Sequence, residues 1–219
     1  MLNIALDGPC GSGKSTVADI LAKKLDILHL DTGAMYRACA LGALKRGINC
    51  LDEKAVCGFI DEINMEILYE NGKQKTVLDG EDVSEKIRAN EVSMMASDIS
   101  SLKCVREKMV DMQKQVAKCN DCILDGRDIG TVVLPDTQYK FYITASPEVR
   151  ADRRHKELLL KGQTVDFDDL IEEINKRDYN DTHRKISPLK KAPDAILIDT
   201  SEMTVDEVVD KLIEYIKKV

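Results

Sequence analysis

The chain has 219 residues, of which 43% are hydrophobic and 32% are charged. This length and composition allow one substantial buried core and exclude disordered and collagen-like proteins. No stretch approaches the ~18 consecutive apolar residues of a membrane-spanning helix. The formal net charge of −7 argues against a protein that binds nucleic acid by neutralising many phosphates. We therefore expect one enzyme domain over residues 1–219, without a nucleic-acid or membrane partner.

The termini and cysteines bear on where the protein resides. Residues 1–4 enter an apolar run with no basic segment before it, so we expect no secretory signal and a cytoplasmic location. The seven cysteines are an odd number and are scattered, which favours reduced thiols over a disulfide framework. Cys119 and Cys122 form an isolated C-x-x-C pair, and we interpret them as structural residues rather than zinc ligands.

Short apolar runs alternate with helical patterns along the chain. Such runs occur at residues 2–6, 27–30, 122–124, 141–143 and 195–198, each bounded by polar or turn residues. They are typical of buried parallel strands. The alternation predicts an α/β fold with a doubly wound, five-stranded parallel sheet and ligands at the carboxyl ends of the strands. Thr204 and Glu207 form a capping box before a final helix that reaches residue 216.

A small antiparallel insert interrupts this alternation at residues 63–86. Residues 65–69 and 73–78 flank Asn71-Gly72, a dipeptide that suits the positive φ angles of a tight hairpin turn. Asp79-Gly80 can turn the chain again into a third strand, before a helical region at residues 85–95.

A phosphate-binding loop (P-loop) follows the first predicted strand and opens a helix. Residues 8–15 satisfy G-x-x-x-x-G-K-[ST] in the strand-loop-helix context that supports this motif. Its backbone N–H groups and the helix N-terminus favour phosphate oxygens. We expect Lys14 to reach the β and γ phosphates of ATP and Ser15 to hold Mg²⁺. The predicted ATP-binding residues are Gly8, Pro9, Cys10, Gly11, Ser12, Gly13, Lys14, Ser15 and Thr16.

A P-loop alone leaves GTPases, ATPases and small-molecule kinases open. The stretch Asn175-Lys176-Arg177-Asp178 matches the N-K-x-D guanine-recognition pattern of GTPases. No D-x-x-G occurs, however, and Asn175 lies in a charged, helix-like stretch rather than after a buried strand. We interpret the match as a coincidence.

Four segments resemble the bacterial cytidylate kinase family, and the likeness extends over essentially the whole chain. They are the P-loop and residues 30–37, 125–131 and 177–184, which read LDTGAMYR, DGRDIGT and RDYNDTHR. The hairpin insert also resembles the extra small domain of that family. The resemblance implies transfer of the γ-phosphoryl group of Mg²⁺-ATP to CMP and dCMP by a monomer.

The resemblance also implies which residues form the site. The implied CMP-binding residues are Thr32, Arg37, Ser97, Arg106, Arg127, Asp128, Arg177, Asp181 and Arg184. The implied catalytic residues are Lys14, Arg127, Arg177 and Arg184, of which the last two belong to a helical lid at residues 149–186. Thr32 stands where relatives often have serine. Asn180 and Thr182 stand where some relatives have arginine, and Arg153 and Arg154 are candidates to compensate for that charge.

The residue types suit this chemistry. A nucleotide phosphate is already an anion, so catalysis consists mostly of positioning and charge neutralisation, for which arginine is well shaped. The carboxylate of Asp128 can accept from the amino group of cytosine. None of the three histidines is required. Two alternatives remain: the same reaction with UMP, AMP or another acceptor, and a nucleotide-dependent switch that binds a protein.

Overall fold

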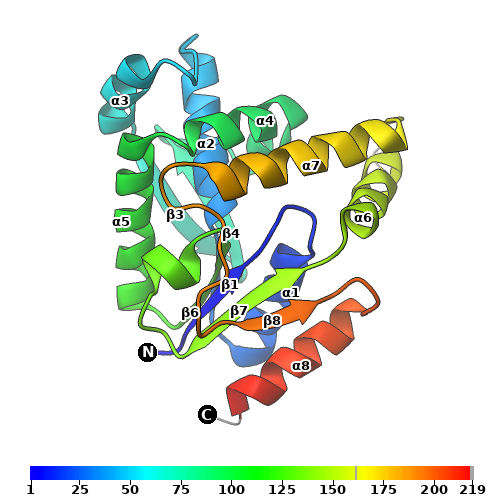
Figure 1. The fold of residues 1–219 in the computed structure, drawn as a ribbon. Helices are drawn as coiled ribbons and strands as arrows, with labels where there is room; N and C mark the ends of the chain where they lie inside the picture. The colour runs from blue at the N-terminus through cyan, green and yellow to red at the C-terminus, as the bar shows by residue number, and fades with distance from the viewer. Residues whose placement is uncertain (161, 218–219) are drawn as a thin grey trace.

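Two sheets organise the part of the chain described by the computed structural model, residues 1–160 and 162–217. Lys161, within the predicted lid, and residues 218–219 of the predicted domain lie outside the described residues. The larger sheet is parallel, with strand order β2-β6-β1-β7-β8, and the smaller one is antiparallel, with order β3-β4-β5 (Figure 1). The predicted five-stranded parallel sheet and antiparallel insert are confirmed. The strands are β1 (Asn3–Asp7), β2 (Leu28–Asp31), β3 (Met65–Glu70), β4 (Lys73–Leu78), β5 (Glu81–Asp82), β6 (Cys122–Gly126), β7 (Tyr139–Thr144) and β8 (Ile196–Asp199).

Helices cover both faces of the parallel sheet. They are α1 (Lys14–Leu25), α2 (Thr32–Lys45), α3 (Glu53–Glu62), α4 (Asn90–Ile99), α5 (Lys103–Cys119), α6 (Pro147–Leu160), α7 (Phe167–His183) and α8 (Val205–Lys217), with a 3₁₀ turn η1 (Lys86–Arg88) and a π-helical turn η2 (Ile129–Val133). The predicted helix at 85–95 is therefore a short 3₁₀ turn followed by α4, which begins at Asn90. None of the helices in the described part of the chain has the length and apolar character that crossing a membrane requires.

The side-chain alternation of the strands divides the core into two layers. Ile4, Leu6 and Ile123 point to the face covered by α1 and α8, whereas Ala5 and Leu124 point to the face covered by α2 and α5. All these side chains are fully buried. The first strand is thus apolar on both faces because it lies at the centre of a covered sheet, as its sequence predicts.

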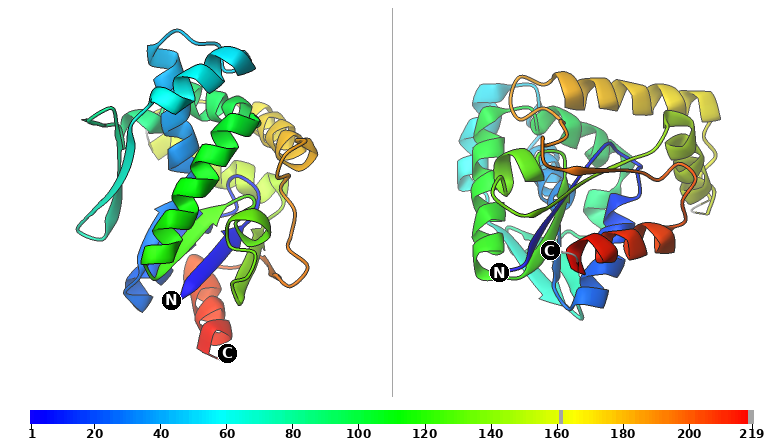
Figure 2. Two further views of the ribbon diagram at one scale, coloured as in Figure 1. Left: turned by 90° about the vertical axis from the view of Figure 1, so that its left-hand side faces the viewer. Right: turned by 60° about the horizontal axis from the view of Figure 1, so that its bottom comes forward.

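The small sheet lies beside α2 and the end of β2 (Figure 2). Asn71 and Gly72 turn the hairpin with φ angles of 52° and 73°. Gln74 on β4 accepts a hydrogen bond from the Asp31 backbone N–H at 2.7 Å. The insert therefore contacts the backbone at the start of α2.

A disulfide between Cys57 on α3 and Cys104 on α5 contradicts the expectation that the cysteines are all reduced. The two residues are separated by 47 positions in the sequence. Their pairing depends on how α3 packs against α5, and neither the number nor the spacing of the cysteines indicates that packing.

The predicted lid region consists of α6 and α7, which form a helical hairpin with a small core of its own. Ala151 and Leu158 of α6 pack against Leu170 and Ile174 of α7. Figure 1 shows α7 lying across the edge of the parallel sheet at which the strands end. The hairpin therefore lies over the edge where a doubly wound sheet binds its ligands.

Candidate active site

The P-loop adopts a conformation that only glycine allows at its first position. Gly8 has φ 148°, and a Cβ built there would lie 1.9 Å from the Ile143 carbonyl oxygen of β7. Gly13, with φ 90°, precedes the first turn of α1. These two residues bend the chain from the centre of the sheet into a helix whose N-terminal N–H groups face a ligand.

Lys14 is buried beside this loop. Its Nζ donates to the Pro9 carbonyl at 2.7 Å and to Ser12 Oγ at 3.3 Å. Burial, together with the nearby Arg127 guanidinium, lowers the pKa of Lys14 to about 8. An anion placed beside the ammonium group would favour its charged form, so the loop is prepared for phosphate.

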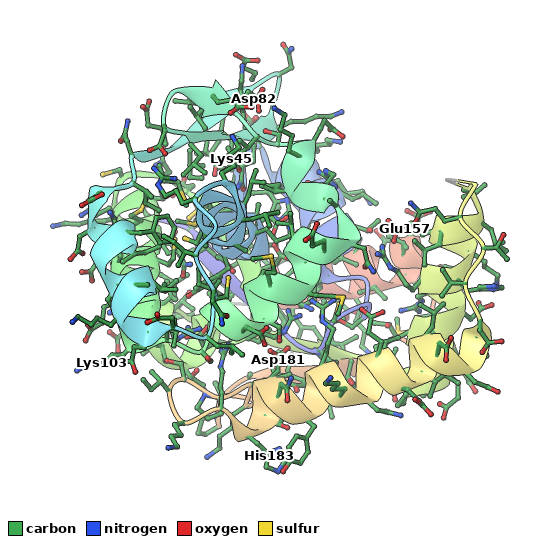
Figure 3. All side chains as sticks on the ribbon, turned by 90° about the horizontal axis from the view of Figure 1, so that it is seen from above. Lys45, Asp82, Lys103, Glu157, Asp181 and His183 are labelled. Atoms are coloured by element: carbon green, nitrogen blue, oxygen red, sulfur yellow. A yellow bond between two sulfur atoms is a disulfide. The ribbon has the colours of Figure 1, made fainter. Side chains whose placement is uncertain are left out.

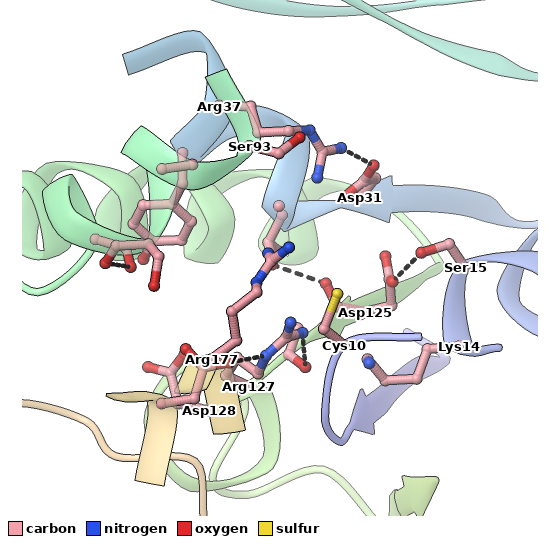
Figure 4. Close-up of a pocket in the computed structure, with 18 of the residues that line it drawn as sticks. Cys10, Lys14, Ser15, Asp31, Arg37, Ser93, Asp125, Arg127, Asp128 and Arg177 are labelled. Carbon is pink, nitrogen blue, oxygen red and sulfur yellow. Dashed lines mark hydrogen bonds and ion pairs between the residues drawn. The ribbon is translucent and has the colours of Figure 1, made fainter. Parts of the chain in front are cut away.

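Two cavities lie on either side of the P-loop, with volumes of about 180 and 620 Å³. Gly11, Lys14 and Ser15 line both of them. The smaller cavity lies below α4 and α7 and is shown in Figure 4. We call it the acceptor cavity, and the larger one, which reaches α6 and α8, the donor cavity.

The acceptor cavity brings together every residue for which the sequence predicts CMP binding. These residues come from α2, α4, α5, the two residues after β6, α7 and the residue after α7, and they are Thr32, Arg37, Ser97, Arg106, Arg127, Asp128, Arg177, Asp181 and Arg184. Segments far apart in the sequence meet because the strand ends lie along one edge of the sheet and α7 lies across it. The roles of the individual residues remain predictions.

The acceptor cavity is positively charged although the whole chain is acidic. Among the described residues, six basic and four acidic side chains line it. The thiol of Cys10 is affected by this positive charge. Burial raises the pKa of the thiol, but the charges of Arg177, Arg127 and Lys14 outweigh burial, so the pKa lies below its ordinary value. A local cluster of this kind favours one or two phosphates rather than a long polyanion.

One end of the cavity holds a buried ion pair. Arg106 on α5 bonds Asp128, and both side chains are at most 5% exposed. Arg184 NH2 lies 3.7 Å from the other oxygen of Asp128. The Tyr36 ring lies 5.4 Å from the Arg106 guanidinium. Arg184, expected among the catalytic arginines, is therefore placed beside the carboxylate that is expected to read the base.

The other end of the cavity faces the P-loop. Arg127 Nε donates to Asp181 on α7 at 2.7 Å, and Arg37 donates to Asp31 at 2.7 Å. Arg177 lies along the same wall (Figure 4). The charges of Arg127, Arg177 and Lys14 all lower the pKa of Cys10 in the P-loop, so these three cationic groups lie around one space, which suits a phosphate with several oxygens.

Three lining residues with polar side chains that the sequence analysis did not assign lie within its motifs. Asp31 is the last residue of β2, Tyr36 lies on α2, and Asp125 is the residue before the end of β6. Asp125 accepts a hydrogen bond from Ser15 Oγ at 2.6 Å through its side chain and one from Thr32 Oγ1 at 2.7 Å through its backbone carbonyl. Polar residues at or near strand ends could have suggested that these side chains line the site. The sequence did not indicate which residues they would hydrogen-bond.

The donor cavity is lined by residues from the P-loop, α1 and α6 and from the segment that leads into α8. Of the predicted ATP-binding residues, Gly11, Ser12, Gly13, Lys14, Ser15 and Thr16 line it. Cys10 lines the acceptor cavity, whereas Gly8 and Pro9 are not among the residues described as lining either. Arg153 and Arg154 line the donor cavity and are not among the described residues that line the acceptor cavity. Figure 3 views this region from above, with α7 in front and α6 at one side.

The N-K-x-D match is contained in a helix. Asn175 and Asp178 are both on α7, and Asp178 forms a two-pronged ion pair with Arg150 at 3.0 and 2.6 Å. Arg150, which is 2% exposed, also donates to the Cys10 carbonyl. Asp178 therefore links α7 to α6 and the P-loop, and the pattern is not a base-binding loop after a strand.

Comparison with known proteins agrees with this geometry. A family model described as cytidylate kinase matches residues 4–218. Cytidylate kinases of Caldicellulosiruptor bescii and Clostridium acetobutylicum are each 49% identical to this chain, over 100% and 99% of it and 96% and 98% of their own lengths. A shikimate kinase from Bacteroides thetaiotaomicron has a TM-score of 0.51 at 14% identity and covers 99% of this chain and 98% of its own. The last likeness concerns the fold alone.

Proposed function

Because the chain belongs to the cytidylate kinase family, we propose that it transfers the γ-phosphoryl group of ATP to CMP and dCMP, giving ADP and CDP or dCDP. The observation that supports this proposal most directly is the wall shared by the two cavities. Gly11, Lys14 and Ser15 border both, so a donor and an acceptor nucleotide would meet with their phosphates at Lys14. Transfer between two bound nucleotides requires such a shared wall.

Charge neutralisation is the main catalytic task in this proposal. The acceptor phosphate is an anion and needs no general base, but it must approach the polyphosphate of ATP against repulsion. Lys14, Arg127 and Arg177 lie around the shared wall and would spread the developing charge. The position of Arg184 beside Asp128 favours a role in holding that carboxylate.

Base selection would take place at the Arg106–Asp128 end. Cytosine presents an amino donor to the carboxylate, whereas uracil would present a carbonyl oxygen to it. A buried acceptor without a donor is costly, so a hydrogen-bonding site of this kind can discriminate strongly. We expect CMP to be preferred over UMP.

Mg²⁺ would enter the site with ATP. The Ser15 hydroxyl lies at the P-loop and donates a hydrogen bond to Asp125. The lone pairs of the Ser15 oxygen therefore stay available for a hard cation. No group of three or more His, Cys, Asp or Glu side chains among the described residues could hold a metal ion without other ligands. Ser15 would therefore hold Mg²⁺ together with phosphate oxygens, and the bound ion would stabilise the negative charge on those oxygens.

The α6–α7 hairpin would act as a lid that excludes water from the shared wall. Asp181 and Asp178 tie α7 to Arg127 and Arg150. Hydrogen exchange with and without CMP plus an unreactive ATP analogue tests this role. We expect stronger protection of residues 149–186 in the doubly bound state, and equal protection in both states would contradict it.

A coupled assay of ADP release tests the proposed reaction. It compares CMP, dCMP, UMP and AMP at saturating Mg²⁺-ATP. Release that depends on CMP or dCMP supports the proposal, whereas a preference for UMP or AMP would contradict it. The monomeric state and the cytoplasmic location stay predictions.

A further inference from the structure

A line of polar contacts runs from the P-loop to the surface of α1. Ser15 Oγ donates to Asp125 Oδ2 at 2.6 Å, and Asp125 Oδ1 lies 3.0 Å from His29 Nε2. The other ring nitrogen of His29, Nδ1, lies 2.6 Å from Asp19 Oδ1. The His29 side chain is 9% exposed and that of Asp125 5%, whereas that of Asp19 is 62% exposed. The histidine therefore joins a buried carboxylate at the P-loop to an outer one.

The two contacts determine the protonation of the ring. Both ring nitrogens face carboxylate oxygens, so both must donate and the ring is an imidazolium. Burial lowers the pKa of His29, but the hydrogen bonds with Asp125 and Asp19 outweigh burial and raise it to about 10. The protonated ring and the Asp125 carboxylate, 3.0 Å apart, thus form a buried ion pair.

His29 can affect nucleotides only through its neighbours. It is not among the described residues that line either the donor or the acceptor cavity. Its bond fixes one oxygen of Asp125, so that the other oxygen points at the Ser15 hydroxyl. A side chain that orients a ligand-binding group from behind can change binding by about 10- to 100-fold.

We propose that His29 is a positioning residue for the donor nucleotide: through Asp125 it orients the Ser15 hydroxyl toward Mg²⁺-ATP, and Asp19 holds the ring in place. This role rests on the proposed function, since it assumes that Mg²⁺-ATP binds at the P-loop. It predicts that loss of His29 weakens Mg²⁺-ATP binding selectively. CMP binding at the Arg106–Asp128 end should change little.

Two substitutions of His29 separate its two contacts. In His29→Gln the longer side chain places an amide donor near the position of Nε2, so it can still reach Asp125. In His29→Asn the amide lies near the position of Nδ1 and reaches only Asp19. Both variants lose the charge, and the asparagine side chain is one methylene group shorter than that of glutamine. Asp125 should therefore stay oriented in the first variant and lose its buried partner in the second.

Titration calorimetry of the full chain gives the measurement. Dissociation constants are determined for ATP with excess Mg²⁺, for ATP with a chelator, and for CMP. We expect His29→Asn to bind Mg²⁺-ATP about 10- to 100-fold more weakly than wild type, and His29→Gln to recover most of that loss. CMP and metal-free ATP should change less than about threefold. Equal losses in the two variants, or an equal loss for CMP, would overturn the proposal.

The outer carboxylate supplies a second test that does not alter the buried groups. Asp19→Asn should weaken Mg²⁺-ATP binding by a few-fold, because the amide can turn its oxygen to the ring but loses the charge. The control is Asp210→Asn. This substitution removes an exposed ion pair between Asp210 on α8 and Lys24, which lies on α1 like Asp19. If His29→Asn does not fold, unchanged Mg²⁺-ATP binding in Asp19→Asn overturns the proposal. If wild type itself binds neither Mg²⁺-ATP nor CMP, the proposed function fails instead.

Discussion

Replacing Asp128 by asparagine should destabilise the protein as well as alter its base selection. The Asp128 and Arg106 side chains are 5% and 3% exposed, and that of Arg184 is 7% exposed. The substitution keeps the shape but leaves two buried guanidinium groups without their anion. Removing one partner of a buried ion pair costs about 3–5 kcal/mol. At about 2–4 °C per kcal/mol for a chain of this size, Tm should fall by about 6–20 °C.

Differential scanning calorimetry without nucleotide measures this change, with Asp79→Asn as a matched control. Asp79 pairs with Arg46 at 2.8 Å, but both side chains are more than a third exposed. Asparagine also tolerates the positive φ of 51° at that position. The control should cost less than about 1 kcal/mol.

Kinetics of the same variant test base reading. The ratio of kcat/KM for CMP to that for UMP should fall in Asp128→Asn, because the amide can donate to the uracil carbonyl. A Tm equal to that of the control, together with an unchanged CMP to UMP ratio, would refute the reasoning.

Three further outcomes follow from the P-loop and its surroundings. Lys14→Ala should lower kcat by at least about 100-fold while the circular dichroism spectrum stays that of wild type, and near-normal turnover would contradict phosphoryl transfer at this loop. Gly8→Ala should cost about 3 kcal/mol in urea unfolding, because its Cβ would lie 1.9 Å from the Ile143 carbonyl oxygen, and an unchanged midpoint would contradict the close approach. The pKa of His29 is raised from 6.5 to about 10, so its contribution to stability is fully present below pH 6.5 and is lost as the pH rises to about 10. Wild type should therefore lose up to about 5 kcal/mol relative to His29→Gln over that range, and parallel stability curves for the two proteins would contradict the charged ring.

The parallel sheet was predictable because its strands are covered on both faces. A strand such as β1 must then be apolar throughout, and a continuous run bounded by polar residues indicates it directly. The Asn71-Gly72 turn likewise predicts the hairpin, because its backbone geometry is local. The predicted start of the helix at residue 85 was wrong, because a 3₁₀ turn and an α-helix have similar apolar spacing over a few residues.

The cavity residues were predictable for a related reason. Motifs that follow parallel strands converge at one edge of the sheet, so Arg37 and Arg127 could be expected at one site, whereas Thr32 was implied by the family resemblance. The partners of these residues could not be predicted. The Cys57–Cys104 disulfide and the contacts of His29 join segments whose packing depends on the whole fold, and no spacing in the sequence records it.

The ion pair between Arg127 and Asp181 gives the acceptor cavity an anion of its own. Because Asp181 is attached to α7, it competes for Arg127 at an effective concentration on the order of millimolar or higher. A small free anion such as inorganic phosphate must displace this carboxylate with one group alone. A nucleotide also gains contacts at the distant Arg106–Asp128 end, so it can offset the displacement. The Asp181 carboxylate thus weakens the binding of a small anion at Arg127 more than the binding of a nucleotide that spans the cavity.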